Sequence, residues 1–262
     1  MKVGLYGMGL MAEGLPDWDT ARSVLRGEAA YMRQPHRTPR TGGLGANEAR
    51  RCPLPARFVI DAGLQALAMS PYAAAVVASV FSSASGDLEI ADKNCRGLAG
   101  TSPALSPTLF HNSVHNAVAG YWGMATGAQT RSISLSAFDD SFAAGLLEAL
   151  TIVTVDGEPT LYVAYDMVPP PAFVPVRRLS ASFAVALVLG PVGNGPYAIL
   201  DATWTAACGT ETIMDDPVLE QLRAQNPAAR SLPLLAAVAR TGKAAIRLRG
   251  TGETGLCMEI DV

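Results

Sequence analysis

Short, continuous apolar runs recur along this chain, and segments rich in glycine, proline and serine separate them. Runs of this length are typical of strands that are buried on both faces of a sheet. The predicted strands are Lys2–Tyr6, Ala74–Phe81, Thr160–Tyr165, Ala181–Leu189 and Tyr197–Trp204. The cluster Gly193-Asn194-Gly195-Pro196 predicts a hairpin turn before the last of these, and Ala244–Arg249 with Leu256–Val262 predicts a hairpin across Thr251–Thr254.

Apolar residues at helical spacing predict helices between these strands. They are Trp18–Gly27, Ala56–Met69, Asp87–Leu98, Asp216–Gln225 and Ser231–Arg240. Strands and helices interleave throughout, and no linker interrupts them. The sequence therefore predicts a single α/β domain over residues 1–262, with a mixed β-sheet covered by helices on both faces.

The stretch from Ser106 to Ala149 predicts a helix, a turn at Gly127, a buried strand over Arg131–Ala137 and a second helix. Ser106 can cap the first helix with its hydroxyl, and Pro107 suits the first helical position, where no N–H is needed. The second helix opens at Asp139 and Asp140.

The junction between that strand and the second helix reads Leu135-Ser136-Ala137-Phe138-Asp139-Asp140. A strand that ends at a helix N-terminus commonly presents a reactive group, because the N–H groups there lower the pKa of a thiol and stabilise negative charge. This junction contains no cysteine. Its two aspartates are interpreted as helix-start residues that complement the helix dipole, with a paired acid/base role as the alternative.

Composition excludes some functions. Hydrophobic residues make up 49% of the chain and charged residues 16%, which predicts a large buried core. A net charge of −3 gives no indication of nucleic-acid binding. Basic residues do cluster over Arg33–Arg57, which is interpreted either as a solvated surface loop or as a patch that attracts an acidic carrier protein.

The four cysteines, Cys52, Cys95, Cys208 and Cys257, are widely spaced and match no zinc pattern. They are interpreted as small buried thiols. The N-terminus lacks a basic region followed by an apolar core, and the apolar runs are shorter than the ~20 residues of a membrane span. We therefore expect a reduced, cytoplasmic setting with no signal peptide and no membrane span.

Gly7-Met8-Gly9-Leu10-Met11-Ala12 follows the first predicted strand and matches the dinucleotide-binding fingerprint. Gly14 and Pro16 interrupt the helix that would hold a pyrophosphate. No nucleotide or other cofactor is expected.

Several of these landmarks together resemble the β-ketoacyl synthase branch of the thiolase-fold condensing enzymes. Those enzymes begin with a strand, a G-x-G turn, a Trp and an L-x-x-G, which match Lys2–Tyr6, Gly7–Gly9, Trp18 and Leu25–Gly27. Their nucleophile strand resembles S-I-S-T-A-C, and Ser132–Ala137 stands in that place. The resemblance covers the first 190 residues well and the last 70 loosely. It implies a thiolase-like layered fold with a shortened second half.

The segment SPTLFHNSVHNAVAGYWGMATGA resembles the chain-length factors of aryl-polyene gene clusters, a short and degenerate subgroup. The nucleophilic cysteine and the two second-half histidines of active ketosynthases are missing. The resemblance implies a non-catalytic subunit with a vacated nucleophile position near Ala137. It also implies a heterodimer with a cysteine-containing ketosynthase, which works on polyenoyl chains bound to an acyl carrier protein.

Two sets of site residues follow from the resemblance. The expected acyl-cavity and gate residues are Phe138, Leu135 and Ser136. Phe138 is expected to plug the tunnel or to point across a dimer interface, with ordinary core packing as the alternative. His111 and His115, four residues apart on a predicted helix, could bind a metal. No third ligand is identifiable, so no bound metal is expected. The expected subunit interface comprises Phe110, His111, Asn112, His115, Asn116, Tyr121 and Trp122.

Two alternative functions remain open. One is a stand-alone β-ketoacyl synthase or acyl transferase with an unrecognised nucleophile, such as Cys208 in the segment Ala206–Thr210. The other is a homodimeric acyl-binding scaffold.

Overall fold

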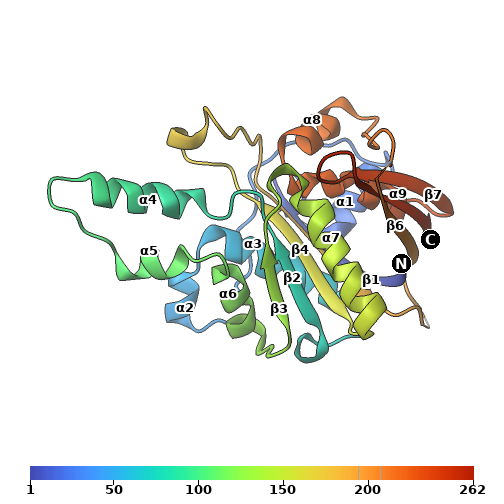
Figure 1. Ribbon diagram of the computed structural model, residues 1–262, viewed down its shortest axis with the longest axis horizontal. Coiled ribbons are helices and arrows are strands. Elements are labelled where there is room, and N and C mark those ends of the chain that lie inside the picture. The colour runs from blue at the N-terminus through green and yellow to red at the C-terminus, as the bar shows by residue number, and fades with distance from the viewer. Residues whose placement is uncertain (194, 207) are drawn as a thin grey trace.

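The computed structural model describes residues 1–193, 195–206 and 208–262. Asn194 and Ala207, which fall in the predicted Gly193–Pro196 hairpin turn and beside Cys208, lie outside the described residues. Within the described ranges the strands form an eight-stranded sheet of order β3-β2-β4-β5-β1-β6-β8-β7 (Figure 1). Their bounds are β1 Lys2–Ala12, β2 Ala78–Ser82, β3 Ser132–Leu135, β4 Thr160–Asp166, β5 Phe183–Gly190, β6 Ala198–Thr205, β7 Lys243–Arg249 and β8 Gly255–Asp261.

The sheet is mixed, as the sequence predicts. Strands β3, β2 and β4 run parallel to one another, and the remaining neighbours are antiparallel. The helices are α1 Trp18–Leu25, α2 Ala46–Arg51, α3 Leu54–Met69, α4 Leu88–Ala99, α5 Pro107–Asn112, α6 Ala117–Thr126, α7 Ser141–Thr151, α8 Pro217–Gln225 and α9 Leu232–Ala239. The α/β class with a helix-covered mixed sheet is therefore confirmed.

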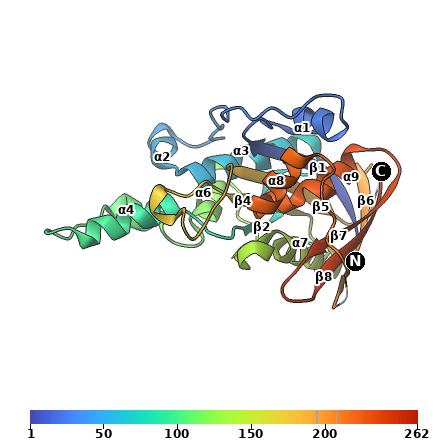
Figure 2. The same ribbon diagram turned by 90° about the horizontal axis from the view of Figure 1, so that it is seen from above.

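Two hydrophobic cores lie on opposite faces of the sheet. Side chains of α3 and α6 form one core, and those of α1, α7, α8 and α9 form the other. In Figure 2 the strands lie between α3 and α7. Every residue of β4 and β5 is buried, because alternate side chains enter the two cores.

Helices do not cover both faces of the whole sheet. Strands β6, β8 and β7 alternate between buried and exposed residues, so one face of this part meets solvent. Strand β3, predicted to be buried, contains only exposed and half-buried residues. That prediction is wrong because β3 is an edge strand, which its own alternation does not reveal.

The predicted G-x-G turn is also wrong. Residues 7–9 lie within β1, which continues to Ala12. A Cβ on Gly9 would lie 1.9 Å from the carbonyl oxygen of Ala62, and one on Gly7 would lie 2.0 Å from that of Ala66. These glycines therefore let α3 approach the sheet closely, and they form no phosphate-binding loop.

The first helix of the central stretch is divided in two. Ser106 caps α5 by accepting a hydrogen bond from Leu109 N–H at 3.5 Å, but α5 ends at Asn112 and α6 begins only at Ala117. Gly127 ends α6 in the left-handed conformation, at φ 71°, as predicted. Helices α4 and α5 lie together in an arm that projects from the body of the protein (Figure 1).

The basic segment Arg33–Arg57 is not simply a solvated loop. It contains α2 and the start of α3. Arg37 also donates two hydrogen bonds to the fully buried carboxylate of Asp61, at 2.5 and 2.7 Å. Burial opposes ionisation of Asp61, yet the hydrogen bonds from Arg37, Arg40 N–H and Gln65 outweigh it and hold its pKa below the usual value.

Candidate functional site

The candidate site lies at the carboxyl ends of the parallel strands β3, β2 and β4. Ser82 is paired with Leu135 on one side and Ala164 on the other, so these strand ends are adjacent. The junction between β3 and α7, the turn after β2 and the last residue of β4 therefore meet at one edge. Carboxyl ends of parallel strands are a common place for ligand sites in α/β proteins.

Phe138 is at the apex of the turn between β3 and α7. Its φ is 51°, and among the described residues it is the one non-glycine residue with positive φ. This conformation brings Cβ close to the backbone and costs about 1–2 kcal/mol. The strained residue is thus Phe138 and not the neighbouring Ala137, near which the vacated nucleophile position is predicted.

Ser141 holds this turn in place. Its hydroxyl accepts a hydrogen bond from Ala137 N–H at 2.9 Å and donates one to the carbonyl oxygen of Phe138 at 2.6 Å. Asp140 N–H donates to the Ala137 carbonyl oxygen at 3.0 Å. Ser141 is itself buried, so the strained turn is fixed from inside the fold.

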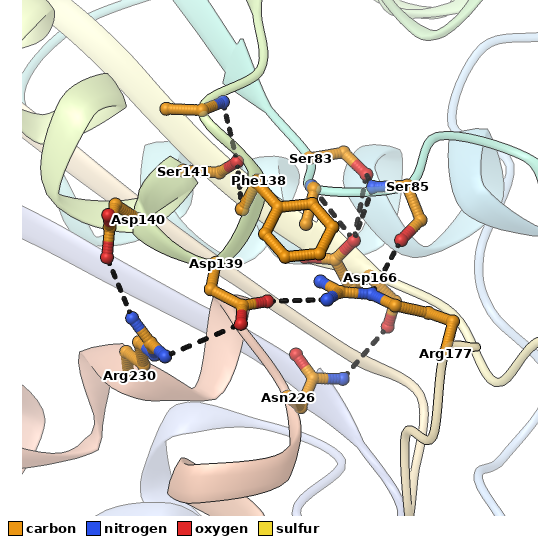
Figure 3. A network of polar contacts seen from close by, with 12 residues as sticks. Ser83, Ser85, Phe138, Asp139, Asp140, Ser141, Asp166, Arg177, Asn226 and Arg230 are labelled. Atoms are coloured by element: carbon orange, nitrogen blue, oxygen red, sulfur yellow. Dashed lines mark hydrogen bonds and ion pairs between the residues drawn. The ribbon is translucent and has the colours of Figure 1, made fainter. Parts of the chain in front are cut away.

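The Phe138 ring points away from the core, with 64% of the residue exposed. Core packing, the alternative predicted for Phe138, is therefore wrong. One face of the ring is covered by Arg177, whose guanidinium carbon lies 4.5 Å from the ring centroid (Figure 3). This distance is within the range of a cation–π contact.

Two arginines neutralise the two aspartates of the junction (Figure 3). Arg177 donates to Asp139 at 2.5 Å, and Arg230 donates to Asp140 at 3.0 Å and lies 3.9 Å from Asp139. Both carboxylates are thus held in ion pairs. This geometry favours a structural role over the alternative acid/base role.

Asp166 ends β4 directly beneath this layer and is 1% exposed. One carboxylate oxygen accepts hydrogen bonds from the Ser83 hydroxyl, Ala84 N–H and Ser85 N–H, and the other has no partner among the described residues. Burial raises the pKa of Asp166 to about 7, against the opposing effects of these hydrogen bonds and of Arg177. A proton on the unpaired oxygen fits this arrangement.

A cavity of about 340 Å³ lies beside the site, between the turn after β2 and the α5–α6 connection. Its lining includes Ser85, His115, Val118, Ser136 and Tyr165. Of the predicted cavity residues, Ser136 lines it. Leu135 does not, because it packs against the core on the α7 side of the sheet, and Phe138 stands outside it.

The predicted interface residues separate into two groups. Phe110, His111, His115 and Asn116 are exposed. Asn112, Tyr121 and Trp122 are only 5%, 3% and 1% exposed, so their assignment to a subunit interface is wrong. Tyr121 donates to Asn112 at 3.2 Å, and Trp122 packs closely against Gly63 of α3.

The structure does not form the histidine pair of a metal site. His111 lies in α5, whereas His115 follows its end, so the two do not share one helical face. In the part of the chain that the structure describes, no group of three or more His, Cys, Asp or Glu could hold a metal ion.

Cys208 is paired with Cys257 in a disulfide, with Cα atoms 5.9 Å apart. This overturns the expectation of free thiols at both positions, and a disulfide-bonded Cys208 cannot be a nucleophile. Burial raises the pKa of the Cys52 thiol to about 11, which keeps it protonated near neutral pH. Cys95 is exposed, contrary to expectation.

Comparison with known families identifies the chain. The sequence model described as "Beta-ketoacyl synthase, N-terminal domain" matches residues 25–250, which include the whole site. The chain belongs to this β-ketoacyl synthase family. The resemblance noted from the sequence is thereby confirmed.

Solved ketosynthase structures share this fold. One chain in the structure of a ketosynthase (ApeO) in complex with its chain length factor (ApeC) from Xenorhabdus doucetiae aligns at 25% identity over 100% of this chain and 100% of that chain, with a TM-score of 0.74. A type II polyketide synthase acyl-carrier protein complex with its ketosynthase (AntDE:AntF) aligns at 12% identity over 100% of this chain and 99% of that chain, with a TM-score of 0.72. The ishigamide ketosynthase/chain length factor aligns at 11% identity over 99% of each chain, with a TM-score of 0.70. No curated protein matches the chain in sequence.

This ketosynthase-family chain contains site residues that sequence reasoning missed. Asp166 was detectable as a charged residue directly after a continuous apolar strand. Nothing in the local pattern marks Arg177 or Arg230, because their partners lie elsewhere in the sequence.

None of the described helices is long and apolar enough to cross a membrane.

Proposed function

We propose that this protein is the non-catalytic chain-length-factor subunit of a ketosynthase heterodimer in an aryl-polyene pathway. The observation that carries the proposal is Phe138 at the strained apex of the strand–helix junction. Condensation needs a nucleophile that can carry the acyl chain, together with a base that activates it. A phenylalanine supplies neither.

The neighbouring groups do not replace the missing nucleophile. The Ser141 hydroxyl is buried and engaged within the turn. Among the described residues, no histidine or cysteine side chain is hydrogen-bonded to residues 136–141. The disulfide also removes Cys208 from the candidates for a stand-alone enzyme.

The edges of the sheet support pairing with another subunit. Edge strand β7 carries Lys243, Arg247 and Arg249, and charged residues disfavour strand addition. Edge strand β3 carries no charge over Ser132–Leu135. An uncharged edge can accept a neighbouring strand, so β3 is the better docking edge.

The projecting arm supports the same conclusion. Leu98, Leu105, Phe110 and Val114 are 37–61% exposed on α4, α5 and their connections. Apolar side chains gathered on a projecting element are typical of a protein interface. The similar complex of ApeO with ApeC consists of a ketosynthase and its chain length factor.

In the proposed heterodimer, the partner ketosynthase supplies the cysteine and this chain helps to shape the acyl cavity. Phe138 is two residues from Ser136, which lines the cavity. A chain delivered by an acyl carrier protein would meet the Phe138 ring between the subunits. The ring then acts as the gate that limits product length.

Co-expression with candidate cysteine-containing ketosynthases, followed by size-exclusion chromatography, tests the pairing. We expect co-elution, and we expect Phe110→Glu to weaken it because a charge replaces an exposed apolar contact on the arm. Val155→Glu is the matched control, because Val155 is 76% exposed just after α7 and away from the arm. Elution of the wild-type protein alone with every such partner would reject the proposal.

Intact-protein mass spectrometry distinguishes the alternative functions. A stand-alone condensing enzyme would acquire a stable acyl adduct from an acyl-carrier thioester, whereas the proposed subunit would not. A homodimeric scaffold would show neither an adduct nor a need for a partner.

A further inference from the structure

The Phe138 ring has little support of its own. It is 64% exposed at the apex of a turn, and Arg177 makes the one ring contact recorded for it among the described residues. A mostly exposed aromatic side chain changes rotamer readily in solution. A gate built from this ring alone would therefore be poorly defined.

Arg177, by contrast, is held on several sides. Its guanidinium donates to Asp139 at 2.5 Å and to the Ser85 hydroxyl at 3.0 Å, and the Asp166 carboxyl lies beneath it (Figure 3). Only 13% of its side chain is exposed. Since a guanidinium is planar and presents its donors in a fixed fork, these contacts also fix the plane that faces the ring.

The segment that carries Arg177 is itself well anchored. It follows the consecutive prolines Pro169, Pro170 and Pro171, whose rings restrict the backbone. Arg177 N–H donates to the carbonyl oxygen of Phe173 at 2.8 Å. Val168 N–H donates to the Ser182 hydroxyl at 3.1 Å and so closes the base of the loop.

We propose that Arg177 is the positioning residue of the Phe138 gate: it holds the ring in one orientation and thereby sharpens the product lengths that the heterodimer allows. This inference rests on the proposed function, because product length is a property of the assembled pair. The ring contact itself belongs to this chain alone. The ring contact and its effect on product length can therefore be tested separately.

The ring contact is tested on the isolated protein. 4-Fluorophenylalanine is incorporated at position 138, and its ¹⁹F NMR signal is compared between the wild-type background and Arg177→Gln. We expect a shifted, narrower signal in Arg177→Gln, because a freed ring averages its orientations rapidly. The ratio of held to free ring orientations should fall about two- to thirtyfold, the range that a cation–π contact supports. Arg178→Gln is the control, since Arg178 is an exposed neighbour that makes no hydrogen bond or ion pair with the described residues. An unchanged signal in Arg177→Gln would overturn the inference.

Product length is tested in the co-expressed heterodimer by liquid chromatography and mass spectrometry. Arg177→Gln should broaden the products towards those of Phe138→Ala, and the double variant should match Phe138→Ala alone. Residues that act through one contact are non-additive, so additive effects would refute the positioning role. Arg177→Lys keeps the charge without the planar face and should resemble Arg177→Gln. If Arg177→Lys fails to fold, the ¹⁹F comparison of the wild-type protein with Arg177→Gln still decides the ring contact. If the wild-type protein fails to pair with a ketosynthase, the proposed function is rejected and the ring contact is not.

Discussion

The strained turn at Phe138 predicts a reversal of the usual order of alanine and glycine stability. At an ordinary helical position, alanine is more stable than glycine by about 1 kcal/mol. At Phe138 the φ of 51° penalises any residue with a Cβ, and glycine is exempt. Phe138→Gly should therefore be more stable than Phe138→Ala.

The size of the reversal follows from two opposing effects. Relief of the left-handed conformation stabilises the glycine variant by about 1–2 kcal/mol. Its more flexible unfolded chain offsets about 0.4–1 kcal/mol of that gain. The two variants lose the contact with Arg177 equally. We thus expect the free energy of unfolding of Phe138→Gly to exceed that of Phe138→Ala by about 1 kcal/mol, which corresponds to a melting temperature about 2–4 °C higher.

Equilibrium urea unfolding of both variants, followed by circular dichroism, measures this difference. The control pair is Gln221→Ala and Gln221→Gly, because Gln221 is exposed within α8. There the alanine variant should be the more stable by about 1 kcal/mol. If alanine is also the more stable residue at position 138, the turn is not strained and the identification of residue 138 as its apex fails.

Three further changes test the fold around the site. Burial raises the pKa of Asp166 to about 7, so the folded protein holds a proton that the unfolded chain releases near pH ~4. Stability should therefore fall as pH rises from about 4 to about 7, and Asp166→Asn should remove that slope in pH-dependent urea titrations. Gly9→Ala should cost about 2 kcal/mol, because the new Cβ would lie 1.9 Å from a backbone oxygen of α3. In the same assay Gly120→Ala should stabilise the protein by about 0.5–1 kcal/mol, because Gly120 lies within α6 and its new Cβ would meet nothing within 4 Å outside its chain neighbours and the backbone of its own helix. Arg37→Met leaves the buried carboxylate of Asp61 unpaired and should cost about 3–5 kcal/mol in urea unfolding; a loss below about 1 kcal/mol would contradict this.

The paired arginines at the junction balance the charge of its two aspartates. Asp139 and Asp140 stand at the start of α7, where negative charge is already favoured by the helix dipole. Arg177 and Arg230 complete the neutralisation of both carboxylates. The junction thus keeps a rigid, electrically balanced frame around a residue that cannot react.

Much of this protein is determined by local sequence. The continuous apolar runs of β4 and β5 predict strands buried on both faces, and the spacing in α3 predicts a long helix; the structure confirms both. The missing cysteine is also a property of the sequence alone. Periodicity and residue chemistry suffice for such features, because each depends on a few neighbouring positions.

The tertiary structure decided what those elements meet. The edge position of β3 and the burial of Trp122 depend on strand order and helix packing, which the 2.0- and 3.6-residue periods do not encode. The close approach of α3 to β1 turned a supposed nucleotide fingerprint into a packing surface. Arg177 reaches Asp139 across 38 residues of sequence, and that contact exists only because the loop after β4 folds back over the start of α7. Local pattern in the sequence determines where strands and helices form, whereas strand order, edge exposure and the partner of each polar side chain are set by the long-range packing of the whole sheet.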